Sequence, residues 1–320
     1  MSRDRGEVTA ASVVIAARNA EDTLPATLAG LAAQDFDGEY EVIVVDDGSA
    51  DGTRDVAEAS ELGITIVTGA GLGPGPARNR GAAVARGAVL AFIDSDCVPD
   101  RGWLRAGVAA LAESEFVQGL VRADPAALAG PFDRTIWVTS ETGLYECASL
   151  FVARELFERI AGFDDWLEVG SGKPLAEDTW FGWRARRAGA RSSFSEQAAV
   201  SHAVFPRSAL AHVGERARRI YFPPIVRKMP ELRRTLLFAG DFLNHRTASF
   251  DLALGATALA VRRRSPHLLV LAAPWLAMVA AGARPWGRRA PAVAAIEALA
   301  DGVTCLSLVA GSIRSRCLVV

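Results

Sequence analysis

The chain has 320 residues, of which 50% are hydrophobic and 22% are charged, so it can bury a sizeable core and is not wholly disordered. Its four cysteines lack the paired spacing of a disulfide scaffold or of a C-x-x-C zinc site, which fits a reducing compartment. The net charge of −2 conceals a division, because residues 1–204 hold 18 Lys and Arg against 31 Asp and Glu, whereas residues 205–320 hold 17 against 6. An acidic half suits a metal ion or supplies ordinary solvated carboxylates, and a basic half suits nucleic acid or an anionic membrane surface.

Short apolar runs alternate with helical patterns along the first hundred residues. The runs are rich in β-branched residues, as buried parallel strands are, and the segments between them are typical of helices. The predicted strands are 12–17, 41–45, 64–67 and 89–93, and the predicted helices between them are 21–33, 51–59 and 75–86. This alternation indicates right-handed βαβ units in a doubly wound α/β sheet, whose ligand lies beyond the carboxyl ends of the strands.

The rest of the chain changes character twice. Between residues 147 and 202 the sequence predicts a strand at 147–152, helices at 154–160 and 177–188, and a loop at 171–174. Later residues are basic and apolar, with runs at 250–261, 268–283 and 290–313. The uncharged run 268–283 is shorter than the roughly 20 residues that a membrane span needs. We therefore expect a domain over 1–204, a basic helical connector over 205–249 and a helical C-terminal region over 250–320.

Asp94-Ser95-Asp96 is the sharpest local feature, at the end of the fourth predicted strand. Two carboxylates at this spacing can converge on a hard divalent cation that bridges two phosphates. D-x-D is also common by chance, and a capped turn before Pro99 explains it equally simply. Asp46-Asp47, at the end of the second strand, could hydrogen-bond a base or ribose, or form an Asx-turn in which Ser49 or Asp51 caps the next helix.

A glycine-rich segment over residues 69–76 resembles a dinucleotide-binding loop but does not match one. Pro76 stands where G-x-G-x-x-G requires its third glycine, and the segment follows the third strand rather than the first. We therefore interpret it as a flexible loop that leads into the next helix. Arg78 in that helix could face a phosphate or a base, or could be an ordinary solvated arginine.

Glu177 and Asp178 begin a predicted helix, where the helix dipole stabilises a carboxylate that could act as a base. Ordinary N-terminal helix chemistry explains the pair equally well. Trp180 and Trp183 in that helix could belong to the core or stack on a sugar. His202 is isolated in the sequence, and a lone histidine is more often structural than a ligand.

The order of these motifs carries more information than any one of them. The blocks that follow one another are SVVIAARN at 12–19, VVDDGSADGT at 44–53, ARNRG at 77–81, AFIDSDCVP at 91–99, FVAR at 151–154, GFD at 162–164, and Glu177-Asp178 with Arg184 and Gly189. In this order they resemble the family 2 glycosyltransferases of the GT-A fold, over about residues 10–204. Three features depart from the family pattern: Ala16 replaces the usual Pro, Ser149 replaces a frequent Asn, and the loop 165–176 is longer than usual.

The resemblance implies an inverting transfer of a sugar from a nucleotide-diphosphate sugar to a hydroxyl group, on a Rossmann-like, mostly parallel sheet with flanking helices. It implies that Asp178 is the catalytic base and that Asp94, Asp96 and His202 hold Mg²⁺ or Mn²⁺. The nucleotide-sugar site that it implies consists of Ala17, Arg18, Asp46, Asp47, Arg78, Asp94, Ser95 and Glu177.

The C-terminal region allows two interpretations, a helical subdomain packed on the core or a membrane-associated element. Its Arg262-Arg263-Arg264, Arg284, Arg288 and Arg289 could meet anionic headgroups while apolar faces enter the lipid. Because many family members act on lipid-linked acceptors, we expect a lipid-linked or cell-envelope acceptor. The interleaved apolar runs argue against nucleic acid. No signal peptide is evident at the N-terminus, so the predicted location is the cytoplasm, peripheral on the inner face of the cell membrane.

Two alternatives remain open. A nucleotidyltransferase would also use carboxylates and a metal, but it should carry a glycine-rich loop after the first strand, and Ala17-Arg18-Asn19-Ala20-Glu21 has no glycine. A non-catalytic protein that binds sugar nucleotides or membranes would be expected to have lost catalytic positions. The presence of Asp94, Asp96 and Asp178 counts against it.

Overall fold

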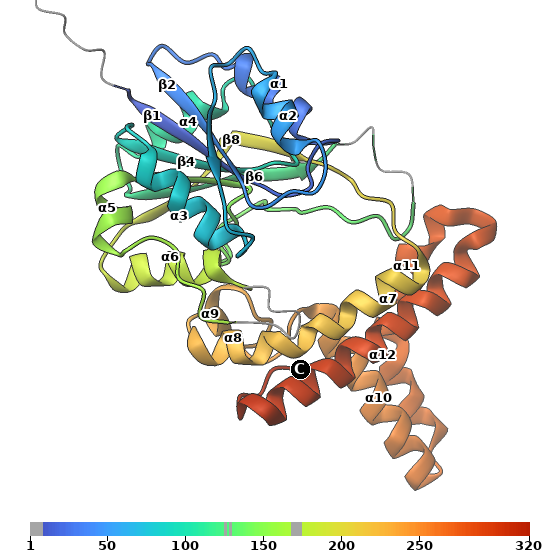
Figure 1. The fold of residues 1–320 in the computed structure, drawn as a ribbon. Helices are drawn as coiled ribbons and strands as arrows, with labels where there is room; N and C mark the ends of the chain where they lie inside the picture. The colour runs from blue at the N-terminus through green and yellow to red at the C-terminus, as the bar shows by residue number, and fades with distance from the viewer. Residues whose placement is uncertain (1–8, 125–126, 128–129, 168–174) are drawn as a thin grey trace, which may run out of the picture. The chain divides into compact units, whose positions relative to one another are not determined.

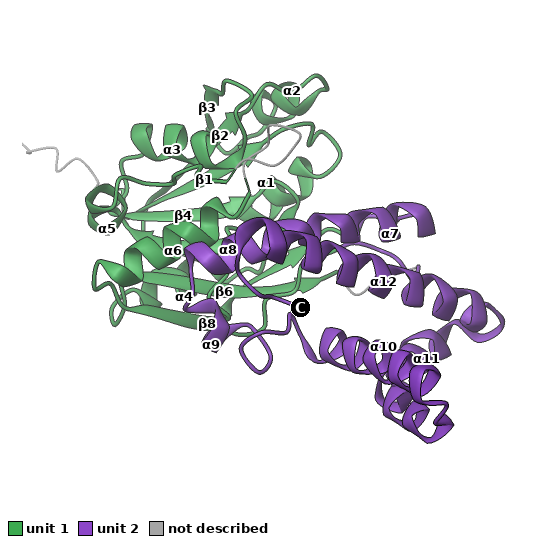
Figure 2. Ribbon diagram, turned by 90° about the horizontal axis from the view of Figure 1, so that it is seen from below, with its two compact units in different colours: residues 1–128, 135–204 green, residues 129–134, 205–320 purple. Residues whose placement is uncertain are grey.

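The structure is a computed structural model that describes residues 9–124, 127, 130–167 and 175–320. The chain divides into two compact units (Figure 2). Unit 1 consists of residues 1–128 and 135–204, and unit 2 of residues 129–134 and 205–320. The loop predicted at 171–174 and the first eight residues lie outside the described residues.

Unit 1 is an eight-stranded sheet with helices packed against it (Figure 1). The strands are β1 (Ala11–Ala17), β2 (Tyr40–Asp46), β3 (Thr65–Thr68), β4 (Val89–Asp94), β5 (Cys97–Pro99), β6 (Phe116–Ala123), β7 (Ser149–Ala153) and β8 (Ser192–His202). The helices are α1 (Leu24–Ala32), α2 (Thr53–Glu58), α3 (Pro74–Val84), α4 (Trp103–Ala110), α5 (Arg154–Arg159) and α6 (Glu177–Arg187). The strand order is β3-β2-β1-β4-β7-β6-β8-β5.

The parallel half of the sheet follows the prediction closely. β1, β2, β3 and β4 are parallel neighbours, and their bounds differ from the predicted ones by one residue at most at either end. Beyond β4 the sheet becomes mixed, because β7 is antiparallel to both β4 and β6, while β6 and β8 are parallel. The sequence analysis did not identify β5, α4, β6 or β8. β8 has polar residues through its first half, so it lacks the apolar run that marks β1 to β4.

The core of unit 1 combines the apolar strand residues with a few large aromatic rings. Val13, Ile15 and Val44 are fully buried on the parallel strands. Trp103 of α4 is also fully buried, and its ring lies 4.7 Å from that of Phe151. The indole N–H of Trp103 donates to Ser149 Oγ at 2.9 Å, so this polar atom is satisfied inside the core. The sheet is therefore a rigid base for the loops at its carboxyl edge.

Unit 2 is mostly helical. Its elements are α7 (Ala209–Arg216), η1 (Ala217–Tyr221), α8 (Phe222–Lys228), α9 (Leu232–Thr235), α10 (His245–Arg263), η2 (Pro266–Ala272), α11 (Ala273–Ala283), η3 (Arg284–Arg289) and α12 (Ala290–Ser315). α12 is the longest helix and contacts α7, α8, α10 and α11. Gly311 permits a close approach to η1, because a Cβ there would lie 2.3 Å from the carbonyl oxygen of Ile220.

The two carboxylates that interrupt the last apolar run have partners inside unit 2. Glu297 accepts from His212 at 3.0 Å and from Arg246 at 2.8 Å. Asp301 pairs with Arg246 at 2.9 Å and accepts from the Trp275 indole at 2.8 Å. These contacts tie α12 to α7, α10 and α11. The carboxylates are therefore part of the packing of unit 2.

Helices α10, α11 and α12 bury mostly small residues, together with Val279, Val293 and Leu308, and expose many large apolar ones. α10 buries Ala253, Ala256 and Ala260, while α12 buries Thr304, Gly311 and Ser312 among others. All but four of the exposed large hydrophobic side chains among the described residues belong to unit 2. On α12 they are Leu299, Leu306, Val309 and Ile313, which share one face of the helix.

Helical structure also runs without a long break from Pro266 to Ser315, and by length and composition this stretch could cross a membrane. The sequence analysis considered the run 268–283 alone and found it too short. The stretch bends at Gly287, where the backbone leaves helical geometry. Apolar core helices of soluble proteins satisfy the same criterion, so length and composition do not by themselves define a span.

Candidate active site

Three loops meet at the carboxyl edge of β1, β2 and β3. Asp47, just after β2, accepts hydrogen bonds from Gly71 N and Gly73 N, each at 2.8 Å. Gly69 lies against the same residue so closely that a Cβ would be 2.6 Å from Asp47 Cα. The glycine-rich segment was interpreted as a flexible loop, and the structure corrects this. Its backbone is fixed by the Asp47 carboxylate, and glycine is required by close approach and by the positive φ of 109° at Gly73.

The neighbouring residues of the predicted nucleotide site lie at this same edge. Asp46 Oδ1 accepts from Ser49 N, three residues further along the chain, at 3.0 Å, so its carboxylate stabilises the turn after β2. Ala17 is buried, and its carbonyl oxygen accepts from Asp47 N at 2.8 Å. Arg18 is exposed, and its guanidinium lies 3.3 Å from Gly71 O. Asp51 bonds Thr53 just before α2, whose N-cap residue is Gly52, so neither Ser49 nor Asp51 is the N-cap residue of that helix.

Arg78 of α3 is the centre of a second group of charges. Its side chain is buried, which excludes the interpretation of a solvated arginine. Nη2 lies 2.7 Å from Asp94 Oδ1 at the end of β4, and Nη1 lies 3.1 Å from Glu177 Oε1 at the start of α6. Burial alone would lower the pKa of Arg78, but the negative groups around it raise it. The guanidinium therefore stays charged and holds the two carboxylates in place.

Asp178 follows Glu177 at the beginning of α6. Burial raises its pKa well above the usual value for aspartate, and the nearby negative charges of Glu177 and Glu146 raise it further. Arg78 and the hydrogen bond from Thr179 N act in the opposite direction. A carboxylate with a raised pKa takes up a proton more readily than an ordinary aspartate. Asp178 thus has the electrostatic environment of a general base.

Glu146 belongs to this cluster and was missed by the sequence analysis. Burial raises its pKa to about 7, and Asp94 contributes to the rise. Its Oε2 atom is buried without a hydrogen-bond partner. Glu146 stands just before β7 in a segment without a recognisable motif, so nothing in the sequence distinguished it from a solvated glutamate. Only the fold shows that it is close enough to Asp94 and Asp178 to influence them.

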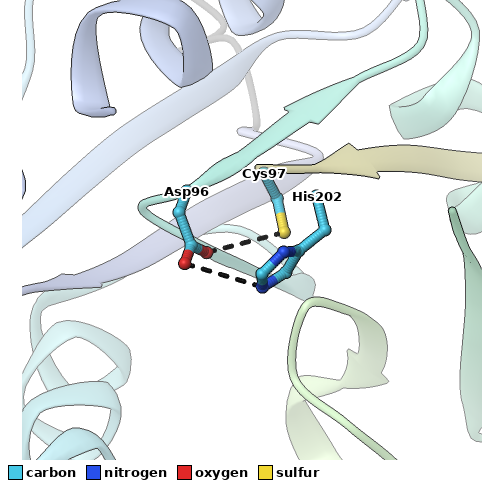
Figure 3. Close-up of side chains that lie close together, drawn as sticks. All are labelled: Asp96, Cys97 and His202. Carbon is cyan, nitrogen blue, oxygen red and sulfur yellow. Dashed lines mark hydrogen bonds and ion pairs between the residues drawn. The ribbon is translucent and has the colours of Figure 1, made fainter. Parts of the chain in front are cut away.

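The remaining residues of the D-x-D motif face a different partner. Asp96 Oδ2 lies 3.5 Å from His202 Nε2, as expected for two residues predicted to share a metal ion (Figure 3). Cys97, which the sequence analysis did not predict as a site residue, lies beside them and donates to Asp96 Oδ1 at 3.9 Å. Asp94 instead contacts Arg78. Ser95 contributes its backbone carbonyl, which accepts from Thr27 Oγ1 at 3.1 Å.

The two tryptophans of α6 differ in environment. Trp183 is buried, and its indole N–H donates to Gly143 O at 3.0 Å, so it is a core residue. Trp180 is half-buried, and the guanidinium of Arg187 lies 5.3 Å from the centre of its ring. Only Trp180 has a ring at the surface, and a cation already lies over it.

Comparisons with known proteins agree with this fold and site. Residues 12–137 match the model of the family described as Glycosyl transferase family 2. The chain is 34% identical over 106 residues to glycosyltransferase AglE of Haloferax volcanii, covering 32% of this chain and 35% of that protein. It is 41% identical over 106 residues to validoxylamine A glucosyltransferase of Streptomyces hygroscopicus subsp. limoneus, covering 32% and 23% of the two chains. The chain thus spans little more than a third, or less, of the length of these relatives.

Solved structures share the fold at low sequence identity. The mannosyltransferase PcManGT of Pyrobaculum calidifontis, in complex with GDP-Man and Mn²⁺, is 19% identical with a TM-score of 0.56, covering 96% of this chain and 86% of that one. Residues 1–349 of S. aureus TarS, in complex with UDP-GlcNAc, are 20% identical with a TM-score of 0.51, covering 96% and 92%. The chain therefore shares its fold with solved glycosyltransferases. The match to glycosyltransferase family 2 covers residues 12–137.

Proposed function

We propose that this chain transfers a sugar from a nucleotide-diphosphate sugar to a hydroxyl group, with inversion at the anomeric carbon. The observation that carries the proposal is the group formed by Arg78, Asp94, Glu177 and Asp178. This group links Asp94, at the end of β4, to Asp178, whose pKa is raised. Ligands of doubly wound sheets bind at such strand ends. A base that removes the acceptor proton from the side opposite the leaving group gives inversion.

The donor nucleotide would bind at the loops after β1 and β2. Asp46 and Asp47 would contact the base and ribose, with Ala17 and Arg18 at the rim of the same edge. Asp47 would act in two ways, because its carboxylate also fixes the backbone of Gly71 and Gly73. Arg78, Asp94, Ser95 and Glu177 would line the side nearer the diphosphate and sugar. The GDP-Man and UDP-GlcNAc in the neighbouring structures support a nucleotide-sugar donor.

The side chains of Asp96 and His202 suit a divalent metal ion. In the neutral imidazole, Nδ1 lies 2.6 Å from the carbonyl oxygen of Ala203 and donates to it, so Nε2 presents a lone pair toward Asp96. Such an ion, Mg²⁺ or Mn²⁺, would stabilise the negative charge that develops on the leaving diphosphate. Asp94, which Arg78 holds in place, would complete the proposed metal site.

The acceptor would be lipid-linked or part of a cell-envelope glycan, and the enzyme would work on the inner face of the cell membrane. The exposed apolar side chains of unit 2 support this proposal. Helices that bury small residues and expose large apolar ones resemble membrane helices, in which small residues permit close packing. Arg262, Arg263, Arg264, Arg284, Arg288 and Arg289 are exposed and could contact anionic headgroups.

A donor panel tests the proposed activity. The purified protein is incubated with uridine-, guanosine- and thymidine-diphosphate sugars and Mn²⁺, and release of the nucleoside diphosphate is measured with and without EDTA. We expect release from a restricted set of donors, with EDTA abolishing it and Asp178→Asn reducing it strongly. Release of inorganic pyrophosphate from a nucleoside triphosphate and a sugar phosphate would instead indicate a nucleotidyltransferase.

A further inference from the structure

We infer that Cys97 is a third protein ligand of the metal site, so that Asp96, Cys97 and His202 form a carboxylate–thiolate–imidazole centre for a borderline divalent ion such as Zn²⁺ or Co²⁺. The inference concerns the metal site of the proposed function, and it replaces Mg²⁺ or Mn²⁺ there by a borderline ion. It rests on the proposed function only for the role of the ion in the reaction, because metal binding can be measured without turnover.

The sheet brings the three side chains together. Cys97 of β5 and His202 of β8 are directly opposite each other in an antiparallel pair, so both side chains lie on the same face of the sheet. Asp96 precedes β5 and turns toward both, as Figure 3 shows. One potential ligand atom from each residue lies within 4.8 Å of the others, and no other such group occurs among the described residues.

The histidine is already held in the orientation that a metal ligand needs. Besides the Ala203 carbonyl at 2.6 Å, Thr135 Oγ1 lies 3.3 Å from Nδ1. Metal-binding histidines commonly fix their second ring nitrogen on a carbonyl in this way. The lone pair of Nε2 is thereby directed toward Asp96, whose Oδ2 lies 3.5 Å away.

The donor atoms decide which ion the centre prefers. Mg²⁺ selects oxygen ligands, whereas a thiolate with an imidazole and one carboxylate selects Zn²⁺ and its neighbours among the transition metals. Without metal, the Cys97 thiol donates to Asp96 Oδ1. Binding breaks this hydrogen bond, forms the sulfur–metal bond and releases the thiol proton to the buffer. Three protein ligands leave further positions of the ion open, as in catalytic zinc sites.

Cobalt provides a direct readout. A thiolate bound to Co²⁺ gives an intense near-ultraviolet charge-transfer absorption that oxygen and nitrogen ligands do not give. We expect this band to saturate at one equivalent of Co²⁺ in the full-length protein. It should disappear in Cys97→Ser, with a loss of Zn²⁺ affinity of at least tenfold. Cys147→Ser is the matched control, since Cys147 is also buried in unit 1 but lies outside the cluster, and it should keep the band.

The outcomes separate this inference from the proposed function. If Co²⁺ binds without the band, or if Cys97→Ser keeps it, Cys97 is not a ligand and the metal role of Asp96 and His202 stands. If no divalent ion binds, both the inference and the metal-dependent mechanism fail. Should Cys97→Ser not fold, X-ray absorption of the zinc-loaded wild type decides. A zinc–sulfur distance of about 2.3 Å supports the inference. Zinc bound only to nitrogen and oxygen, at about 2.0–2.1 Å, overturns it.

Discussion

Arg78 Nη2 lies 2.7 Å from Asp94 Oδ1, and this pair links helix α3 to the end of strand β4 inside unit 1. The same guanidinium reaches Glu177 at 3.1 Å, which is the residue before the proposed base. One buried cation thus connects the D-x-D motif to the start of α6. The geometry of both depends on it, since each carboxylate would otherwise face other negative groups without compensation.

Removing this cation should destabilise the protein strongly. In Arg78→Met, Asp94 and Glu177 lose their partner while remaining partly or fully buried, a change that typically costs about 3–5 kcal/mol of unfolding free energy. Arg78→Lys should cost less in stability. A lysine cannot contact Asp94 and Glu177 through two fixed nitrogens, so this variant should still lose activity. Urea unfolding measures the free energy. Arg80→Met is the control, because Arg80 is two residues away and exposed. Equal small effects of Arg78→Met and Arg80→Met would contradict the structural role.

Much of this site was predictable because local patterns encode it. The apolar strands β2 and β4 end in Asp46 and Asp94, and parallel strands bring their carboxyl ends to one edge. The ordered motifs then led to the prediction that Asp46, Asp94 and Asp178 are site residues.

What could not be predicted depends on contacts between distant segments. Arg78 is 99 positions from Glu177, and periodicity could not show that it was buried rather than solvated. Cys97 meets His202 only because β5 pairs with β8, two strands that the sequence analysis did not identify. Glu146 has no motif at all, and its pKa depends on surroundings that the fold creates.

The proposed base leads to a kinetic prediction. Asp178→Asn removes the proton acceptor with almost no change in shape, so kcat should fall by about 10²–10⁴ while donor affinity stays nearly constant. Steady-state kinetics and calorimetric titration of the donor measure the two quantities. Asp55→Asn, an exposed aspartate on α2, should change neither. A collapse of donor affinity with unchanged turnover of bound donor would make Asp178 a binding residue.

Glu146 leads to a prediction about pH and stability. Its pKa is about 7 in the folded protein against a usual value of 4.5, so the folded state keeps a proton that the unfolded state releases between these values. The free energy of unfolding should therefore fall as pH rises from about 4.5 to about 7, by on the order of 3 kcal/mol. Glu146→Gln cannot ionise and should lose this fall. Asp178 is present in both proteins, but the charge of Glu146 raises its pKa, so removing that charge lowers the pKa of Asp178 and contributes to the difference between the two profiles.

Urea unfolding at pH 5 and pH 8 measures the difference. The variant should gain stability relative to wild type at pH 8 and not at pH 5. Glu113→Gln, at a solvent-exposed position, serves as the control and should leave the pH dependence unchanged. Parallel pH profiles of wild type and Glu146→Gln would show that Glu146 ionises normally in the folded protein.

Asp47 should matter for the order of the loop as well as for the nucleotide. Asp47→Ala leaves the N–H groups of Gly71 and Gly73 without their acceptor, which should lower the unfolding free energy by roughly 2 kcal/mol, as for hydrogen bonds to charged groups. Hydrogen exchange of the segment 69–73 should become faster. Asp37→Ala, at an exposed position, should have no such effect. Unchanged exchange in Asp47→Ala would mean that the glycine loop is fixed by other contacts.

The exposed apolar side chains of unit 2 lead to the last prediction, which concerns membranes. Full-length protein should cosediment with vesicles that contain anionic lipid, and more weakly in high salt. Changing Arg262, Arg263 and Arg264 to Gln should reduce binding on the order of 100-fold, since each basic residue contributes about 1 kcal/mol near an anionic surface. Leu306→Lys, which charges the apolar face of α12, should also reduce it, whereas Val84→Lys, at an exposed apolar position in unit 1, should not. High salt weakens the electrostatic part of membrane binding. A difference between Leu306→Lys and Val84→Lys shows that apolar side chains of α12 also contact the membrane. If the protein is a monomer that does not bind anionic vesicles at low salt, the membrane role is refuted and unit 2 is a structural helical subdomain.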